Sequence, residues 1–115
     1  MQRMMSMPNY SKNSIILVRY PFSDLSGFKV RPAVIVSTTH VSQDILIVPL
    51  TSKVSSLLPG EFVLAEWKKA GLNVPTAAKR GIYTIENKLV RKTIGKLQPQ
   101  DVRQLEKSLR NWLGL

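Results

Sequence analysis

The residues best suited to chemistry lie where apolar segments begin or end. Arg31 precedes the apolar run 33–36, and Thr51 and Ser52 follow the apolar run 45–50. A guanidinium is permanently charged and presents a rigid set of donors to a phosphate, and a hydroxyl can donate a further hydrogen bond. Preorganised donors of this kind stabilise developing negative charge. These three residues are therefore candidates for phosphate chemistry, although arginine at a strand end and Ser or Thr in a turn also serve purely structural purposes.

A basic stretch later in the chain offers further contacts to an anion. From Lys79 to Lys96 there are six basic residues and one acidic residue, Glu86. Lys79 and Arg80 are candidates for phosphate contacts, and Tyr83 is a candidate for stacking on a base of single-stranded RNA. The alternative is a charged face that meets only solvent.

The chain as a whole is strongly basic. Its 115 residues include 17 Lys and Arg against seven Asp and Glu, which gives a formal net charge of +10 and a pI near 10.3. Such an excess favours a polyanionic partner, because neutralising phosphates releases condensed counterions. Charge that serves only solubility is the alternative. Charge alone does not distinguish RNA from DNA, anionic lipid or an acidic protein.

The cysteine and histidine counts restrict the chemistry. The chain has no cysteine, which excludes disulfides and thiolate catalysis and suits a reducing cytoplasm. A single histidine, His40, excludes a histidine-rich metal site. No stretch reads as a signal peptide or a membrane span. We therefore expect a cytoplasmic protein without membrane attachment that uses neither a metal nor an organic cofactor.

Short β-branched segments separated by turn residues predict a mainly β domain. We expect strands at 14–20, 31–38, 44–50, 61–65, 76–80, 81–85 and 91–97. The second and third are almost wholly apolar, which predicts that both of their faces are covered. Residues 1–13 are expected to form a loose tail and residues 14–115 a single domain.

The end of the chain changes to helical periodicity. Pro99 is favourable in a first helical turn, Asp101 places negative charge near the positive end of the helix dipole, and Gly114 suits a helix end. We predict a helix over 99–113 whose apolar stripe packs on the rest of the domain or on a partner. The stripe consists of Val102, Leu105, Leu109, Trp112 and Leu113. The predicted fold is a small, mostly antiparallel β-barrel with a C-terminal α-helix.

Three stretches of the chain resemble the MazF/PemK family of toxin endoribonucleases. These stretches are 21–27 with Arg31 and Pro32, then 48–52, and then 83–86 with 94–97. The first is similar to the family's first loop and to the Arg-Pro that opens its second strand. The second is similar to its strand that ends in Thr-Ser or Thr-Ala. The third is similar to its late Thr-Ile-Asp and Lys-Ile-Gly-Lys-Leu elements, and the stretches occur in the family's order.

The resemblance implies an SH3-like barrel, a homodimer and cleavage of single-stranded RNA. It also implies inhibition by a cognate antitoxin with an acidic, partly disordered segment. By their positions in the motifs, Arg31 and Thr51 are implied to be catalytic. The loop similar to the family's substrate-gating loop, the end of the third strand and the basic stretch supply the expected substrate-binding residues. These are Asp24, Ser26, Gly27, Lys29, Ser52, Lys53, Lys79, Arg80 and Tyr83.

One motif of the resembled family is missing. Some members carry an Arg-x-Asp pair shortly before Thr-Ile-Asp that acts as acid and base, whereas residues 78–83 read AKRGIY and contain no carboxylate. Tyr83 also stands where many members have an arginine. The general base is therefore unassigned, and Asp24 is a candidate to orient Arg31 or to take part in proton transfer.

The expected function is that of a toxin of a type II toxin-antitoxin system. It would cleave RNA sequence-selectively and without metal, with the ribose 2′-hydroxyl as nucleophile, and would leave 2′,3′-cyclic phosphate and 5′-hydroxyl ends. The missing pair supports an alternative, a non-catalytic barrel that binds nucleic acid or an acidic protein. A toxin that targets DNA gyrase through the same barrel is the third possibility.

Overall fold

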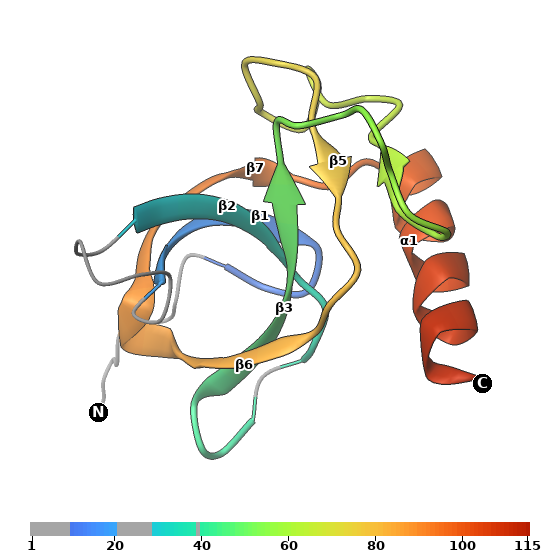
Figure 1. Cartoon of the computed structure of the whole chain (residues 1–115). Coiled ribbons are helices and arrows are strands. Elements are labelled where there is room, and N and C mark those ends of the chain that lie inside the picture. Colours follow the sequence, from blue (N-terminus) through green and yellow to red (C-terminus); the bar gives the residue numbers. More distant parts are fainter. Residues whose placement is uncertain (1–9, 21–28, 39) are drawn as a thin grey trace.

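Antiparallel strands form one strongly curled sheet in a computed structural model of the chain, which describes residues 10–20, 29–38 and 40–115 (Figure 1). The elements within these residues are β1 (Ser14–Tyr20), β2 (Lys29–Ile35), β3 (Asp44–Thr51), β4 (Phe62–Val63), β5 (Ala77–Ala78), β6 (Tyr83–Glu86), the 3-10 turn η1 (Asn87–Leu89), β7 (Val90–Lys96) and α1 (Pro99–Leu113). The sheet order is β4-β5-β3-β2-β1-β7, and β6 also pairs with β3. The predicted mainly β, antiparallel fold with a C-terminal helix is confirmed.

Several predicted strands are shorter in the structure, for identifiable reasons. β2 ends at Ile35 rather than residue 38, because the backbone N–H of Leu46 donates to the Ser37 hydroxyl (3.0 Å) instead of continuing the ladder. β5 covers only two residues. Beyond it the N–H of Lys79 donates to the Pro49 carbonyl (2.9 Å), but Pro49 has no N–H with which to return the bond.

The central strands separate two apolar cores. The core inside the curl contains Ile16, Val18, Ala33, Ile35, Ile45, Ile47 and Ile85. The outer core contains Ile15, Val34, Val48, Leu50, Leu64, Ala70, Ala78, Leu97 and Leu105. Alternate residues of one strand enter different cores, as the period of two requires. The prediction that β2 and β3 are covered on both faces is therefore confirmed for residues 33–35 of β2 and for residues 47, 48 and 50 of β3.

Helix α1 covers part of the outer face and has the predicted bounds (Figure 1). Leu105 is buried, and Val102 and Leu109 pack against the outer core. The indole N–H of Trp112 donates to the carbonyl of Pro59 (3.0 Å). Leu113 does not pack on the rest of the domain and is 55% exposed, because it is the last helical residue before the left-handed Gly114. For this residue the predicted contact with a partner stays a prediction.

Buried polar groups join α1 to the segment before β5. The carboxylate of Asp101 is 2% exposed and accepts hydrogen bonds from the backbone N–H groups of Ala65 (2.8 Å) and Glu66 (2.9 Å). The Ser108 hydroxyl donates to the Gly60 carbonyl (2.7 Å). Asp101 therefore holds the turn after β4 to the helix, a role beyond the dipole effect expected from sequence.

The turn held by Asp101 crosses β7 at close range. The N–H of Lys96 donates to the Ala70 carbonyl (3.2 Å), and a Cβ added to Gly95 would collide with that same oxygen. Gly71 has a φ of +99°, which favours glycine. Two glycines thus permit the contact of two backbones, and this contact sets the path of residues 71–76.

The N-terminal tail falls mostly outside the described residues. Residues 1–9 are not among them. Asn13, at the end of the predicted tail, donates its N–H to the Ile35 carbonyl (2.7 Å) and accepts from Leu97 N–H (2.9 Å). Within the described part of the chain, no helix is long and apolar enough to cross a membrane.

Candidate functional site

A groove of about 420 Å³ lies on the outer face of the sheet, on β1, β2, β3 and β7 and beside residues 71–76. Its apolar lining consists of Leu17, Val30, Pro32, Leu50, Leu72, Val74 and Ile94. Its polar lining consists of Arg31, Thr51, Ser52, Asn73, Thr76 and Lys92, with Gly71 completing the wall. The groove thus brings together three predicted residues, Arg31, Thr51 and Ser52.

Arg31 and Thr51 lie on neighbouring strands at the point where their pairing stops. The β2–β3 ladder runs from Ile35 opposite Ile47 to Ala33 opposite Pro49. Val36 donates its N–H to a β3 carbonyl, so by alternation the backbone polar groups of Pro32 also face β3. Pro32 has no N–H to donate, which weakens the ladder at this position. Beyond it, β2 contributes Arg31 and β3 contributes Thr51 to the same groove.

The hydroxyls at the end of β3 are available to a ligand. Thr51 Oγ1 accepts a hydrogen bond from the backbone N–H of Lys53 (3.1 Å). This contact uses an acceptor lone pair and leaves the hydroxyl proton free to be donated. Ser52 is exposed and also lines the groove. Lys53 is exposed but is not among the lining residues.

Among the described residues, two cations, Arg31 and Lys92, line the groove, and no carboxylate does. Neither forms an ion pair with a residue that the structure describes. Lys92 was not singled out from the sequence, where it was one of the six basic residues of the late stretch. Its position depends on the register of β7, in which Lys92 lies opposite Leu17. No pattern local to β7 indicates that register.

The other predicted basic residues lie outside the groove lining. Lys79 has its ammonium group 4.0 Å from the carboxylate of Glu61, and the backbone N–H of Arg80 donates to the same carboxylate (2.9 Å). Tyr83 lies on β6 opposite Ile47. Lys29 opens β2, opposite Tyr20, and its side chain is exposed. Asp24, Ser26 and Gly27 are outside the described residues.

Glu61 connects the loop before β4 to the segment after β5. Its side chain is only 3% exposed, and its second oxygen accepts from Leu58 N–H (2.8 Å). Burial opposes the charged carboxylate, but hydrogen bonds from Arg80 and Leu58 and the positive charges of Lys79 and Arg80 outweigh it. The pKa of Glu61 is therefore lowered from its ordinary value of 4.5. This carboxylate has a structural role and is not part of the groove.

The donor types that transition metals and zinc prefer do not gather in the described residues. No group of three or more His, Cys, Asp or Glu side chains there is placed to hold a metal ion. The groove instead offers a guanidinium, an ammonium group and hydroxyls, which are donors to an anion.

The family model of PemK-like, MazF-like toxins of type II toxin-antitoxin systems matches residues 12–113. The chain belongs to this family. No curated protein sequence matches the chain significantly. The match spans β1 to α1 and therefore includes every described residue that lines the groove.

Solved structures agree with this membership of the PemK-like, MazF-like family. An endoribonuclease in complex with its cognate antitoxin, from Mycobacterial species, has 19% identity and a TM-score of 0.73, covering 92% of this chain and 96% of that one. The Mycobacterium tuberculosis toxin MazF-mt6 has 21% identity and a TM-score of 0.69, with 89% and 97% covered. A MazE-MazF crystal structure from Deinococcus radiodurans has 15% identity and a TM-score of 0.75, with 92% and 96% covered. At sequence identities of 15–21%, the similarity to these structures establishes a shared fold and nothing further.

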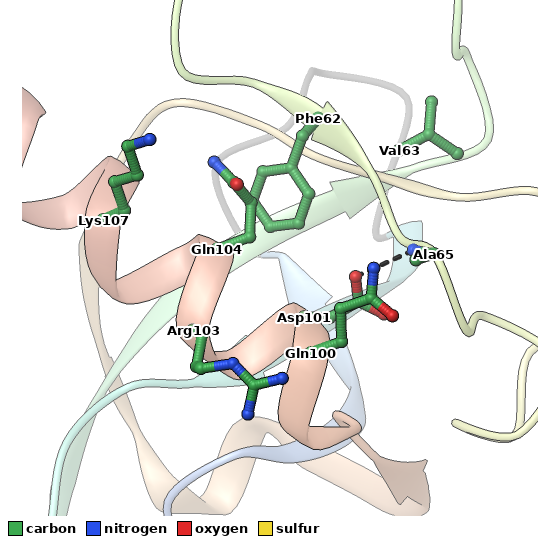
Figure 2. Close-up of a pocket in the computed structure, with 8 residues that line it drawn as sticks. All are labelled: Phe62, Val63, Ala65, Gln100, Asp101, Arg103, Gln104 and Lys107. Carbon is green, nitrogen blue, oxygen red and sulfur yellow. Dashed lines mark hydrogen bonds between the residues drawn. The ribbon is translucent and has the colours of Figure 1, made fainter.

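This PemK/MazF-like chain has a second groove of about 420 Å³, between β4 and α1 (Figure 2). Its lining consists of Phe62, Val63, Ala65, Gln100, Asp101, Arg103, Gln104 and Lys107. Figure 2 shows the carboxylate of Asp101 beside the backbone of Ala65, to which it is hydrogen-bonded. Both oxygens of Asp101, the one acid among the described lining residues of this groove, are engaged by backbone donors. Arg103 and Lys107 also line it, but no described hydroxyl side chain does. We assign the candidate site to the groove of Arg31 and Thr51, where cations and hydroxyls occur together.

Proposed function

We propose that this chain is a toxin endoribonuclease that cleaves single-stranded RNA. The observation that carries the proposal is the groove shared by Arg31, Thr51 and Ser52, lined by no carboxylate of the described residues, in a member of a family of toxins. Cations without an ion pair to a described residue, together with hydroxyl donors, are suited to a phosphodiester, and exposed apolar side chains beside them are suited to bases. The net charge of +10 favours the same polyanion.

In the proposed reaction, the ribose 2′-oxygen attacks phosphorus and the bond from phosphorus to the 5′-oxygen breaks. The 2′-hydroxyl loses its proton, the leaving 5′-oxygen gains one, and the products carry a 2′,3′-cyclic phosphate and a 5′-hydroxyl. Arg31 stabilises the charge on the non-bridging oxygens. The Thr51 hydroxyl, whose oxygen already accepts from Lys53 N–H, donates to one of those oxygens. Ser52 provides a further donor.

The proton acceptor does not come from the described lining of the groove, which has neither a carboxylate nor an imidazole. Asp24 remains our candidate, either as the base or as the group that orients Arg31. We also propose Ser26, Gly27 and Lys29 as substrate contacts. Lys53, Lys79, Arg80 and Tyr83 would then contact RNA only beyond the groove, because they are not among its lining residues.

We further propose that the protein acts in the cytoplasm as a homodimer, and that residues 14–115 form its domain. A cognate antitoxin encoded beside its gene would inhibit it through an acidic segment that competes with RNA for the groove. The endoribonuclease from Mycobacterial species and the MazF of Deinococcus radiodurans are both described in complex with antitoxins. The charge of the groove supports this competition, because its described lining residues include two cations and no carboxylate.

The test is to incubate the protein with mixed-sequence single-stranded RNA in EDTA and to map cut sites and end groups. Arg31→Ala is compared with Arg110→Ala, which removes an exposed arginine from the last turn of α1. We expect cutting by the wild type and by Arg110→Ala, with 5′-hydroxyl ends, and its loss in Arg31→Ala. Products with 5′-phosphates, or cutting of DNA alone, would contradict the proposal.

The described lining residues include no carboxylate and no imidazole, which favours one second candidate, a non-catalytic barrel that binds nucleic acid. Tight RNA binding without cleavage, at high excess of protein over RNA, would establish it. A supercoiling assay tests the third possibility, a toxin that targets DNA gyrase.

A further inference from the structure

We propose that Lys92 forms a second phosphate site, which binds an RNA phosphate adjacent to the scissile one held by Arg31. The inference rests on the proposed function of the groove and adds to it a residue that the motifs do not indicate. Lys92 is a binding residue in this proposal and takes no part in the chemical step.

The first support is the position of Lys92 across the sheet. Lys92 on β7 lies opposite Leu17 on β1, and Leu17 lies opposite Pro32 on β2. Neighbouring strands are about 4.8 Å apart, so the backbone of Lys92 lies about 10 Å from that of Pro32, beside Arg31. Lys92 and Arg31 therefore enter one groove from strands that β1 separates, which allows them to hold different phosphates.

The second support is the apolar surface between the two cations. Leu17 and Pro32 lie in the row that connects Lys92 to β2, and Val30 lines the same groove. A nucleoside separates successive phosphates of an RNA strand, and bases bind to apolar and aromatic side chains of single-strand-binding proteins. The apolar lining between the strands that carry Lys92 and Arg31 thus offers a surface for the nucleoside that joins two phosphates.

The third support is that Lys92 has no competing carboxylate. It is exposed, and it makes no ion pair with a described residue. Lys88 and Lys79, from the same basic stretch, each face a glutamate, at 3.3 Å and 4.0 Å. Arg91, the preceding residue of β7, is also exposed but does not line the groove. Among these basic residues Lys92 is therefore the one placed and left available for substrate.

The experiment compares Lys92→Gln with Arg91→Gln, which removes the same charge from the adjacent position. Binding is measured over a range of salt concentrations, with RNA that carries 2′-O-methyl ribose throughout and so lacks the attacking hydroxyl. We expect Lys92→Gln to weaken binding about fivefold and to reduce the slope of log K against log salt by about 0.7, the value for one phosphate contact on a single strand. Arg91→Gln should retain the wild-type slope and affinity to within about twofold.

The location of the contact is tested with RNA that has one neutral methylphosphonate linkage at successive positions. For the wild type, one position next to the cleaved bond should weaken binding about as much as Lys92→Gln does. In Lys92→Gln, the same neutral linkage should have no further effect. The proposal would be overturned if the neutral linkage weakened binding by Lys92→Gln as much as binding by the wild type at every position. Equal salt-dependence slopes for Lys92→Gln and Arg91→Gln would also overturn it.

Failure of the proposed function gives a different pattern. Suppose that Lys92→Gln lowers the salt-dependence slope for binding of 2′-O-methyl RNA, but the wild type does not cut ordinary RNA. The second phosphate site is then supported and the nuclease proposal fails. If wild type cuts RNA and Lys92→Gln has an unchanged KM, the nuclease proposal holds and the site at Lys92 is overturned. Melting temperatures within about 2 °C of the wild type show that both variants are folded.

Discussion

The outer face of the sheet has two ends that differ in how their polar groups are used. At the end covered by α1, Asp101 and Ser108 are buried and hydrogen-bonded to backbone groups at 2.7–2.9 Å. At the other end, Arg31 and Lys92 line an open groove without an ion pair to any described residue. The first arrangement connects segments of the chain, and the second leaves charge available to a ligand.

The comparison shows that the presence of a charged residue in a hollow is not sufficient to assign function. The α1–β4 groove and the groove of Arg31 each have a volume of about 420 Å³. Each is lined by two exposed cations, Arg103 and Lys107 in the first and Arg31 and Lys92 in the second. They differ in what accompanies the cations, which is a carboxylate held by backbone donors in the first and the hydroxyls of Thr51, Ser52 and Thr76 in the second. A buried polar group that is fully paired supports the fold, whereas an exposed and unpaired cation near hydroxyls is suited to bind an anion. Substitutions at the two ends should therefore separate activity from stability.

The largest expected effect is on activity, from Arg31→Ala. Loss of a preorganised donor to the transition state should lower kcat/KM for RNA by about 100- to 1000-fold. The free energy of unfolding should change by less than about 0.5 kcal/mol, because Arg31 is exposed. Cleavage kinetics and urea unfolding of the same preparation check both values, with Arg110→Ala as the control. Comparable activity losses in the two variants would remove Arg31 from the proposed chemistry.

The opposite pattern is expected from Asp101→Ala, at the covered end. This change leaves the N–H groups of Ala65 and Glu66 without their acceptor and should lower the free energy of unfolding by about 2–4 kcal/mol. Asp101→Asn should cost less, because its amide oxygen still accepts one bond. Urea unfolding at fixed protein concentration measures the change, and Glu106→Ala, an exposed acid on the same helix, serves as control. An equal, small effect of both alanine variants would show that the buried contacts do not hold α1.

Thr51→Val should have a smaller effect on activity than Arg31→Ala. The change removes one neutral donor to the phosphate, which corresponds to about a tenfold lower kcat, or about 1.4 kcal/mol. Thr51→Ser should retain most of the activity, because it retains the hydroxyl. Thr84→Val, in exposed β6, is the control for an equivalent change outside the groove. Full activity of Thr51→Val would restrict that residue to a turn role.

The smallest expected effect comes from Glu61→Gln and depends on pH. The lowered pKa means that the charged carboxylate contributes stability that is complete above the ordinary value of 4.5 and is lost as pH falls through the lower folded value. Near pH 7 the substitution should lower the free energy of unfolding by about 1 kcal/mol. The difference from wild type should shrink below pH 4.5. Unfolding curves at several pH values measure it, and a difference that grows on acidification would contradict the assignment. Glu106→Gln is the control.

The sequence by itself determined the class of fold and part of the site. Period-two apolar segments and a final period-3.6 segment predicted a mainly β domain with a C-terminal helix, and the bounds of β1 and α1 agree with the structure. Arg31 and Thr51 were selected by their positions in motifs that resemble the MazF/PemK family and by their places at the ends of apolar segments. Antiparallel pairing of those strands brings both residues into one groove. These features are local or follow from one pairing of consecutive strands.

Only the tertiary structure decided which basic residues line the groove. Lys92 is brought opposite Leu17 by pairing between the first strand and the last, with irregularities in register on both sides. Lys79 and Arg80 instead meet Glu61, which lies before β4. Asp101 is engaged by a turn 35 and 36 residues away in the chain. Periodicity reports which face of a strand is buried, but a residue's partners across long separations depend on register and close backbone crossings.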